Sequence, residues 1–558
     1  MVHPLPQKIE AKEYISCAET PAIKLTAPQD FLEKRKASGS VFSESGNVEV
    51  TAVIKDCREY SYINEIAKFT REKYILEISG DEKQIEIKAY AASQRGLWYA
   101  LNTIEKFAAK NSFPIGTITD YPLFEMRGLI EGFYGNPWSF EARREIIALA
   151  AKNNMNTYFY APKDDSYHRR RWRELYPEKE LSELADLVRF TGDVYMDFHY
   201  CIAPGLSMCY SSEADFEDLV NKTKQLYSIG IRKFGLLLDD IPEKLAHKED
   251  VEQYGETVNA HIDLINRYYD FVIKLDGENE LTICPMLYHG KGNEYYIAKL
   301  GQTIPPMVNI FWTGLDICSR EITTYEAIRF IDNTKHRPLY WDNYPVNDAE
   351  MLNEMHIGPI IGRENDLYKS AKGLIANCME YAQCTKIPLM TIADYLWNPE
   401  KYDSDSSFRN AVDANIEEEG REHFIIFADH LKTSCLKDAN SYIMEQALVK
   451  AAAMLTGGDF LGAFSEVEEY GSKLFAAADY LKDKNEGIYA ELKRWKDKFV
   501  FCAEIFEQAV EYMNTGDEEV GKKIAEMNAK YNSEATVLTG FCFRAFIELI
   551  LAGLDVED

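Results

Sequence analysis

The sequence of 558 residues lacks several features that would narrow its class at once. No apolar run is long enough to cross a membrane, and the opening Met-Val-His-Pro-Leu-Pro-Gln-Lys contains no apolar core of a secretion signal. The eleven cysteines form no Cys-x-x-Cys pair and no Cys/His spacing typical of zinc, and their odd number excludes complete pairing within the chain. These absences predict reduced, mostly buried thiols and a cytoplasmic protein, although removal of an export signal would leave the same sequence.

Basic residues are outnumbered. Lysine and arginine total 62 against 91 acidic residues, which gives a formal charge of −29 and a pI near 4.9. A protein of this charge repels phosphate backbones and anionic lipid, so we expect no nucleic acid and no membrane as partner. The balance fits an enzyme or binding protein for neutral or cationic material. We predict no cofactor.

Proline is missing from the 159 residues after Pro399, where amphipathic helical patterns recur at 443–455 and 500–513. At the other end, alternating residues at 74–79 and 84–90 predict a hairpin, and 94–107 has helical spacing. The chain is therefore expected to comprise an N-terminal α+β domain (1–122), a central domain (123–405) and a C-terminal helical bundle (406–558).

The central region contains eight β-rich runs separated by stretches long enough for helices. This count favours a (β/α)₈ barrel over a doubly wound open sheet, and it places the site at the carboxyl ends of the strands. The runs are 127–135, 157–163, 194–204, 233–240, 281–290, 307–314, 337–347 and 373–379.

Two adjacent carboxylates, Asp239 and Asp240, end the fourth run, Lys-Phe-Gly-Leu-Leu-Leu-Asp-Asp (233–240). Adjacent charges at the edge of an apolar core are costly, because each repels the other and desolvation disfavours both. One alternative is a pair without catalytic function, which is solvated or caps a helix. A divalent-metal site is another, with His199 and His289 at other strand ends as possible further ligands.

Aromatic, amide and ammonium groups follow the other runs. Rings that pack on the apolar face of a sugar, beside groups that bind its hydroxyls, suit a neutral carbohydrate. Each residue taken singly has a packing or solvated alternative, so the argument rests on their coincidence at strand ends. The residues are Glu131 to Trp138, Lys163, Tyr288, Trp312, Thr313, Trp341, Asn343, Asp348 and Asn377.

An adjacent pair that a turn brings into one pocket suits substrate-assisted hydrolysis, in which the 2-acetamido oxygen of the substrate attacks C1. Five motifs then show a resemblance to glycoside hydrolase family 84, the O-GlcNAcases and related bacterial β-N-acetylglucosaminidases. They are Gly-Phe-Tyr-Gly-Asn-Pro-Trp (132–138), Tyr-Ala-Pro-Lys-Asp-Asp (160–165), Leu-Leu-Leu-Asp-Asp-Ile-Pro (236–242), Tyr-Trp-Asp-Asn-Tyr-Pro-Val-Asn-Asp (340–348) and Gly-Leu-Ile-Ala-Asn (373–377).

The resemblance implies a role for each matching residue. Asp239 would orient and polarise the acetamido group, and Asp240 would act as general acid and then as general base. Tyr288 would bind the acetamido oxygen. The backbone of Gly132 and the side chains of Lys163, Asn343, Asp348 and Asn377 would hold the sugar, in a pocket shaped by Tyr134, Trp312, Thr313 and Trp341.

The function expected from this resemblance is a retaining exo-β-N-acetylglucosaminidase that acts on a GlcNAc-bearing glycan or glycoprotein without metal. Two alternatives stay open: an endo-acting, hyaluronidase-like hydrolase that uses the basic cluster Arg-Arg-Arg-Trp-Arg (169–173), and a GlcNAc-binding protein without turnover. That cluster is otherwise a solvated face paired with Glu174 and Glu178. The aglycone, and the choice between monomer and homodimer, are not determined by the sequence.

Overall fold

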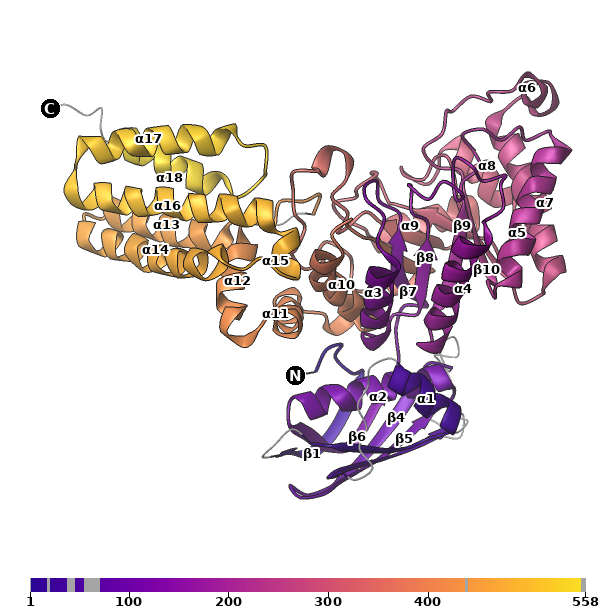
Figure 1. Cartoon of the computed structure of the whole chain (residues 1–558), viewed down its shortest axis with the longest axis horizontal. Coiled ribbons are helices and arrows are strands. Elements are labelled where there is room, and N and C mark those ends of the chain that lie inside the picture. Colours follow the sequence, from indigo (N-terminus) through magenta and orange to yellow (C-terminus); the bar gives the residue numbers. More distant parts are fainter. Residues whose placement is uncertain (1, 18–20, 38–45, 55–70, 437–439, 553–558) are drawn as a thin grey trace. The chain divides into compact units, whose positions relative to one another are not determined.

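The computed structural model describes residues 2–17, 21–37, 46–54, 71–436 and 440–552 (Figure 1). They separate into two compact units. The first comprises 1–343, 363–378 and 392–403, and the second comprises 344–362, 379–391 and 404–558. Among the described residues, no helix is both long and apolar enough to span a bilayer.

The first unit begins with a six-stranded mixed sheet in the order β1-β6-β4-β5-β3-β2. The predicted hairpin is confirmed, because β4 and β5 pair antiparallel from Tyr74↔Ala91 to Gly80↔Ile85. The predicted helix is α2, capped by the Ser93 hydroxyl, which accepts the Gly96 N–H. The elements are β1 (Lys8–Ser16), β2 (Ile23–Thr26), α1 (Gln29–Ala37), β3 (Val48–Ile54), β4 (Tyr74–Gly80), β5 (Ile85–Ala91), α2 (Gln94–Ala109) and β6 (Ser112–Asp120).

The predicted (β/α)₈ barrel is also confirmed. Eight parallel strands close in chain order, with β14 paired to β7. Every strand lies inside its predicted run, give or take one residue. They are β7 (Met126–Glu131), β8 (Thr157–Tyr160), β9 (Asp197–Ile202), β10 (Lys233–Leu237), β11 (Glu280–Cys284), β12 (Asn309–Trp312), β13 (Pro338–Asp342) and β14 (Gly373–Asn377).

Helices follow the strands around the barrel. The Ser139 hydroxyl caps the first of them by accepting the Ala142 N–H. The helices are α3 (Phe140–Lys152), α4 (Glu178–Asp193), α5 (Glu213–Ser228), α6 (Lys248–Tyr254), α7 (Thr257–Leu275), α8 (Tyr295–Thr303) and α9 (Thr324–Thr334). Helix α10 (Ala382–Trp397) comes after the last strand.

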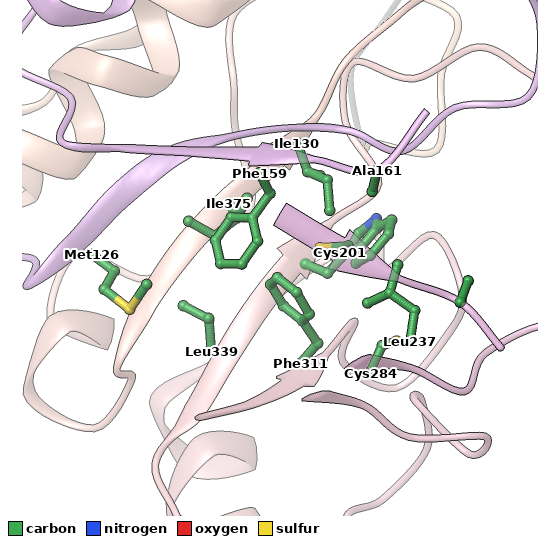
Figure 2. Packing of buried hydrophobic residues seen from close by; sticks show 12 residues of the cluster. Met126, Ile130, Phe159, Ala161, Cys201, Leu237, Cys284, Phe311, Leu339 and Ile375 are labelled. Atoms are coloured by element: carbon green, nitrogen blue, oxygen red, sulfur yellow. The ribbon is translucent and has the colours of Figure 1, made fainter. Parts of the chain in front are cut away.

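The interior of the barrel is filled by side chains from alternate strand positions (Figure 2). Phe311 packs edge-on against Phe159 and Trp341, at ring-centroid distances of 5.0 and 5.2 Å. Because side chains alternate across a strand, the neighbours of these residues point outward. The interior is therefore a packed core, and a site is expected at or beyond the carboxyl ends of the strands.

The described residues of the second unit from 404 onward are mainly helical, as the absence of proline after Pro399 predicted. Its buried rings pack edge-on between helices, for example Phe427 against Phe499 at 5.0 Å and Tyr470 against Phe506 at 5.7 Å between ring centroids. The domain boundaries at 122 and 405 stay predictions. The helices are α11 (Ser404–Asn415), α12 (Arg421–Asp429), α13 (Tyr442–Thr456), α14 (Phe460–Lys482), α15 (Ile488–Glu491), α16 (Lys493–Thr515), α17 (Glu518–Ser533) and α18 (Phe541–Ala552).

Candidate active site

The adjacent aspartates lie just beyond the end of β10. The strand stops at Leu237, and Leu238 is still tied to β11 through its N–H, which donates to the Cys284 carbonyl at 2.9 Å. Asp240 then adopts a left-handed backbone with φ of 51°. A left-handed backbone is strained for a residue other than glycine, because the Cβ atom crowds the backbone. The turn breaks the alternation of the strand, so two sequence neighbours can face the same side.

The contacts of Lys163 show that Asp239 and Asp240 face the same side. Its ammonium group, carried by the loop after β8, donates to Asp239 Oδ2 at 2.8 Å and lies 3.7 Å from Asp240 Oδ2. The lysine is 8% exposed and Asp239 is 9% exposed, so this ion pair is buried. The alternative of a solvated loop lysine is thus contradicted, and the structure places Lys163 between the two carboxylates.

Lys163 and Asp239 each stabilise the charged form of the other. Burial would raise the pKa of Asp239, but the Lys163 ammonium group outweighs burial and holds that pKa below its ordinary value. Burial would likewise lower the pKa of Lys163, but Asp239 and the nearby Tyr134 and Asp240 raise it. Asp239 is therefore an ionised hydrogen-bond acceptor at neutral pH.

Asp240 has different surroundings. Its side chain is 34% exposed, and two phenols bind it: Tyr134 donates to Oδ2 at 2.7 Å and Tyr288 donates to Oδ1 at 3.0 Å. Burial, and for Tyr288 the carboxylate beside it, raise the pKa of both phenols, so they stay protonated donors. Tyr288 thus contacts Asp240 in this structure, where the resemblance assigned it to the acetamido oxygen.

A second group of predicted residues forms around Trp341. The indole Nε1–H donates to Asn343 Oδ1 at 2.9 Å, and Asn377 Nδ2 donates to the same oxygen at 2.9 Å. Asn377 Oδ1 is buried and has no hydrogen-bond partner, so this acceptor is available to a hydroxyl donor. Lys163 joins the two groups, since its Nζ lies 5.9 Å from the Trp341 ring centroid.

Gly132 completes this part of the site. A Cβ atom at this position would lie 2.5 Å from Trp341 Cζ2 and 3.2 Å from Asn377 Oδ1. Only glycine lets the chain after β7 pass this close to both side chains. The backbone of Gly132 therefore lies where a ligand held by Trp341 and Asn377 would meet it.

Three predicted residues have other surroundings. Trp312 points outward from β12 and packs against Phe330 of α9, at 4.9 Å between ring centroids. The Thr313 hydroxyl donates to the Asp316 carbonyl at 2.7 Å, while its N–H donates to the Tyr288 carbonyl at 2.8 Å, which positions that tyrosine. Asp348 directly precedes the short 3₁₀ helix Ala349–Met351 and belongs to the second unit.

Arg169 is the residue whose role sequence reasoning missed. Its Nη1 donates to Tyr134 Oη at 3.0 Å, so an arginine, a phenol and the Asp240 carboxylate form a hydrogen-bonded chain. The other arginines of the cluster match the solvated interpretation more closely: Arg171 pairs with Glu174, and Arg173 pairs with Asp215. A cluster of four arginines carried no signal for which one faces the site.

Neither His199 nor His289 joins the two aspartates as a third metal ligand. His199 stacks on Phe159 at 4.1 Å, both of its ring nitrogens are buried without a partner, and burial lowers the pKa of the ring. The ring of His289 contacts Tyr288. Among the described residues, no group of three metal-ligating side chains includes Asp239 or Asp240.

Comparisons with known proteins agree with this geometry. The family model for NAGidase, β-N-acetylglucosaminidase, matches residues 127–429. The chain is 30% identical to a solved mutant of the Thermobaculum terrenum O-GlcNAc hydrolase, with a TM-score of 0.73, over 77% of this chain and 95% of that one. CpGH84B, at 24% identity and a TM-score of 0.84, shares the fold over 99% of this chain and all of its own.

The protein O-GlcNAcases of Rattus norvegicus and Mus musculus are 31% identical over 275 residues, which is 48% of this chain and 29% of each of those proteins. The chain thus spans less than a third of the length of these relatives. The family match covers more than half of the chain. The chain belongs to the β-N-acetylglucosaminidase family of glycoside hydrolases, family 84, and the resemblance drawn from the five motifs is confirmed.

Proposed function

We propose that the protein is a retaining exo-β-N-acetylglucosaminidase that uses the 2-acetamido group of its substrate as the nucleophile. The observation that carries the proposal is the unequal setting of the two aspartates. Asp239 is buried and held ionised by a direct hydrogen bond from Lys163, whereas the Asp240 side chain is 34% exposed, lies 3.7 Å from the same ammonium group and accepts hydrogen bonds from two phenols. Two carboxyl groups with different environments suit two different roles in one reaction.

In the first step, the Asp239 carboxylate accepts a hydrogen bond from the acetamido N–H, which increases the electron density on the acetamido oxygen. That oxygen forms a bond to C1 as the bond from C1 to the leaving oxygen breaks. Asp240 donates its proton to the leaving oxygen. The products of this step are the aglycone alcohol and a protonated oxazoline (oxazolinium ion), whose N–H stays hydrogen-bonded to the Asp239 carboxylate, with Asp240 now a carboxylate.

In the second step, Asp240 removes a proton from water as the water oxygen attacks C1, and the C1–O bond of the oxazoline breaks. Two inversions at C1 give net retention. Tyr134 and Tyr288 each donate to an Asp240 oxygen, so they would hold this side chain in place while its charge changes. Lys163 would keep Asp239 ionised throughout.

Retention and leaving-group dependence test the proposal. We expect Asp240→Asn to lose most activity toward alkyl glycosides and to keep much of the first step on 4-methylumbelliferyl β-N-acetylglucosaminide, because an activated aryloxide needs little protonation. Asp239→Asn should lose activity toward both. Proton NMR of the first turnovers should show the β-anomer of GlcNAc. Identical responses of the two variants to the leaving group, or an initial α-anomer, would overturn the mechanism.

Activity in EDTA tests the metal-free assignment, and wild-type turnover should survive the chelator. GlcNAc binding by wild type without any turnover would instead make this barrel a binding protein. Release of only the terminal sugar from a chito-oligosaccharide is expected for an exo-enzyme, and internal cleavage would favour the endo-acting alternative.

A further inference from the structure

Two loops on the strand-end side of the barrel bring a thiol, an imidazole and a carboxylate together. Cys209 lies in the loop after β9, whereas His247 and Glu249 lie at the start of α6, beyond the loop after β10. Strands β9 and β10 are parallel neighbours in the barrel, paired from Lys233↔His199 to Leu236↔Ile202. Their following loops therefore leave the same edge of the sheet side by side.

The three ligand atoms, one from each side chain, lie within 4.8 Å of one another. Zinc bonds of about 2.3 Å to sulfur and about 2.0–2.2 Å to nitrogen and oxygen place the ligands of a tetrahedral site roughly 3.3–3.8 Å apart. Small side-chain rotations are enough to close that difference. In the part of the chain that the structure describes, no other group of three His, Cys, Asp or Glu side chains meets this geometry.

The loop that carries Cys209 is held in place by buried or half-buried carboxylates. Asp215 accepts the Cys209 N–H at 2.8 Å and is itself bound by Arg173. Asp250, which is fully buried, accepts the N–H groups of Tyr210 at 3.0 Å and Ser211 at 2.7 Å. Asp250 belongs to α6, so this residue fixes the cysteine loop against the helix that carries the other two ligands.

Asp250 also contacts the thiol itself. Its Oδ1 lies 3.5 Å from Cys209 Sγ, close enough for the thiol to donate a weak hydrogen bond. The Ser211 hydroxyl lies 3.4 Å from the same sulfur. Surroundings that orient the ligands are typical of built metal sites, in which outer-sphere hydrogen bonds fix the coordinating groups.

We propose that Cys209, His247 and Glu249 bind one zinc-class divalent cation, with water in the fourth position. Sulfur and nitrogen donors select zinc, whereas magnesium and calcium prefer sites made entirely of oxygen. Binding converts the thiol to a thiolate and releases its proton to solvent. Residue spacing does not reveal this site, because Cys209 comes from a different loop than the His247/Glu249 pair.

The site is linked to the catalytic pair by chain continuity. Residues 241–246 run from Asp240 to His247, so an ion that joins His247 to Cys209 restrains the segment directly after the proposed general acid. The ion would act on the position of Asp240 through this segment and would not contact the sugar. The inference stands on its own residues and does not depend on the proposed mechanism.

Cobalt(II) is a suitable probe, because a thiolate ligand gives an intense near-ultraviolet charge-transfer band and tetrahedral geometry gives strong visible bands. Reduced full-length wild type, stripped of metal, should bind about one equivalent of cobalt with both signals and should bind zinc in competition. Cys209→Ser should abolish the charge-transfer band. Asp250→Asn should weaken cobalt binding about 10–100-fold, as for other outer-sphere residues.

Matched variants separate a specific site from general effects. Cys542→Ser removes another half-buried thiol, and Glu243→Gln removes an exposed carboxylate from the loop after β10. Both should bind cobalt as wild type does, whereas Glu249→Gln and His247→Ala should lose tight binding. Circular dichroism in the absence of metal should be the same for all variants. No stoichiometric binding by wild type, or a charge-transfer band that survives in Cys209→Ser, would overturn the proposal.

The Cys209→Ser variant also separates this site from the aspartates. An effect of EDTA on wild-type turnover that disappears in Cys209→Ser belongs to the loop site and supports this inference. An effect that persists in Cys209→Ser would contradict the metal-free mechanism, while the cobalt titration would still decide the present proposal.

Discussion

Glu131 and Asp239 are both buried carboxylates paired with a cation near the end of a barrel strand, yet their surroundings differ. Glu131 accepts both Arg143 Nε and Nη2, at 2.8 and 2.9 Å, the Tyr158 hydroxyl at 2.8 Å and the Trp138 N–H at 3.1 Å. Asp239 receives one ammonium group on one oxygen. The arginine fork saturates its partner, whereas the lysine leaves acceptor capacity for a ligand.

The comparison shows that burial of a charge does not by itself mark a site. Glu131 faces outward from β7 and ties the strand to α3, so its hydrogen bonds serve the fold. Asp239 faces a second carboxylate across a shared lysine. A functional carboxylate is thus distinguished by hydrogen-bond acceptor capacity that the donors of the protein leave open to a ligand.

The largest effect is expected from Asp239→Asn. The amide cannot replace an ionised acceptor for the acetamido N–H, so kcat/KM should fall by about 10²–10⁴-fold, as when one transition-state contact is removed. Thermal stability should change less than activity, because Lys163 retains the Asp240 carboxylate at 3.7 Å. Steady-state kinetics on an aryl glycoside and a melting curve check both statements. Wild-type kcat/KM would contradict the assignment of Asp239.

Glu131→Gln should show the opposite pattern. The substitution leaves the buried Arg143 guanidinium without its charge partner, and breaking such a pair costs about 3–5 kcal/mol. The thermal midpoint of the barrel should drop while the pH dependence of kcat/KM is retained below that midpoint. Differential scanning calorimetry and a pH–rate profile measure the two quantities. A stable variant with a shifted profile would mean that Glu131 belongs to the catalytic machinery.

The part of this comparison that the sequence predicts is the placement of residues at strand ends. Eight runs of β-rich residues located every barrel strand, and the motifs placed Asp239, Asp240 and Lys163 beyond their strands and Asn377 at the end of β14. Strand periodicity fails at Asp240, however, because its left-handed turn cannot be inferred from an apolar run that ends in two acidic residues. The shared orientation of the pair was thus an expectation from chemistry.

At other positions the sequence did not predict the direction of the side chain. Trp312 and Trp341 both lie on barrel strands, but the first packs outward on Phe330 and the second enters the interior beside Phe311. The difference depends on register within strands of four or five residues. Arg169 was missed for a related reason, since only the folded loop shows which of four arginines reaches Tyr134.

Lys163→Met should sharpen the contrast by leaving Asp239 buried without its cation. Burial alone raises the pKa of a carboxyl group, so the acidic limb of kcat/KM, which requires ionised Asp239, should move to higher pH by about 1–3 units. The sign follows from the structure: the lowered pKa of Asp239 keeps activity down to low pH, and this advantage is lost with the lysine.

A wild-type profile that is bell-shaped, as expected for an acid and a base acting together, is the reference for this shift. Lys244→Met is the control, because this exposed lysine follows the aspartates in the sequence and its loss should leave the acidic limb within about 0.3 units of wild type. An unmoved limb in Lys163→Met would mean that Lys163 binds substrate without setting the charge of Asp239.

Arg169→Gln should give the smallest effect. Arg169 acts on Asp240 only through Tyr134, at 3.0 and 2.7 Å along the chain, so its loss removes one hydrogen bond from a phenol that keeps its contact with the carboxylate. A bond of this kind contributes about 1 kcal/mol, or roughly 5-fold in kcat/KM. Arg171→Gln is the matched control, because Arg171 pairs with Glu174 on the exposed side of the same cluster. If both variants behave alike, Arg169 belongs to the solvated face, and the chain of hydrogen bonds ends at Tyr134.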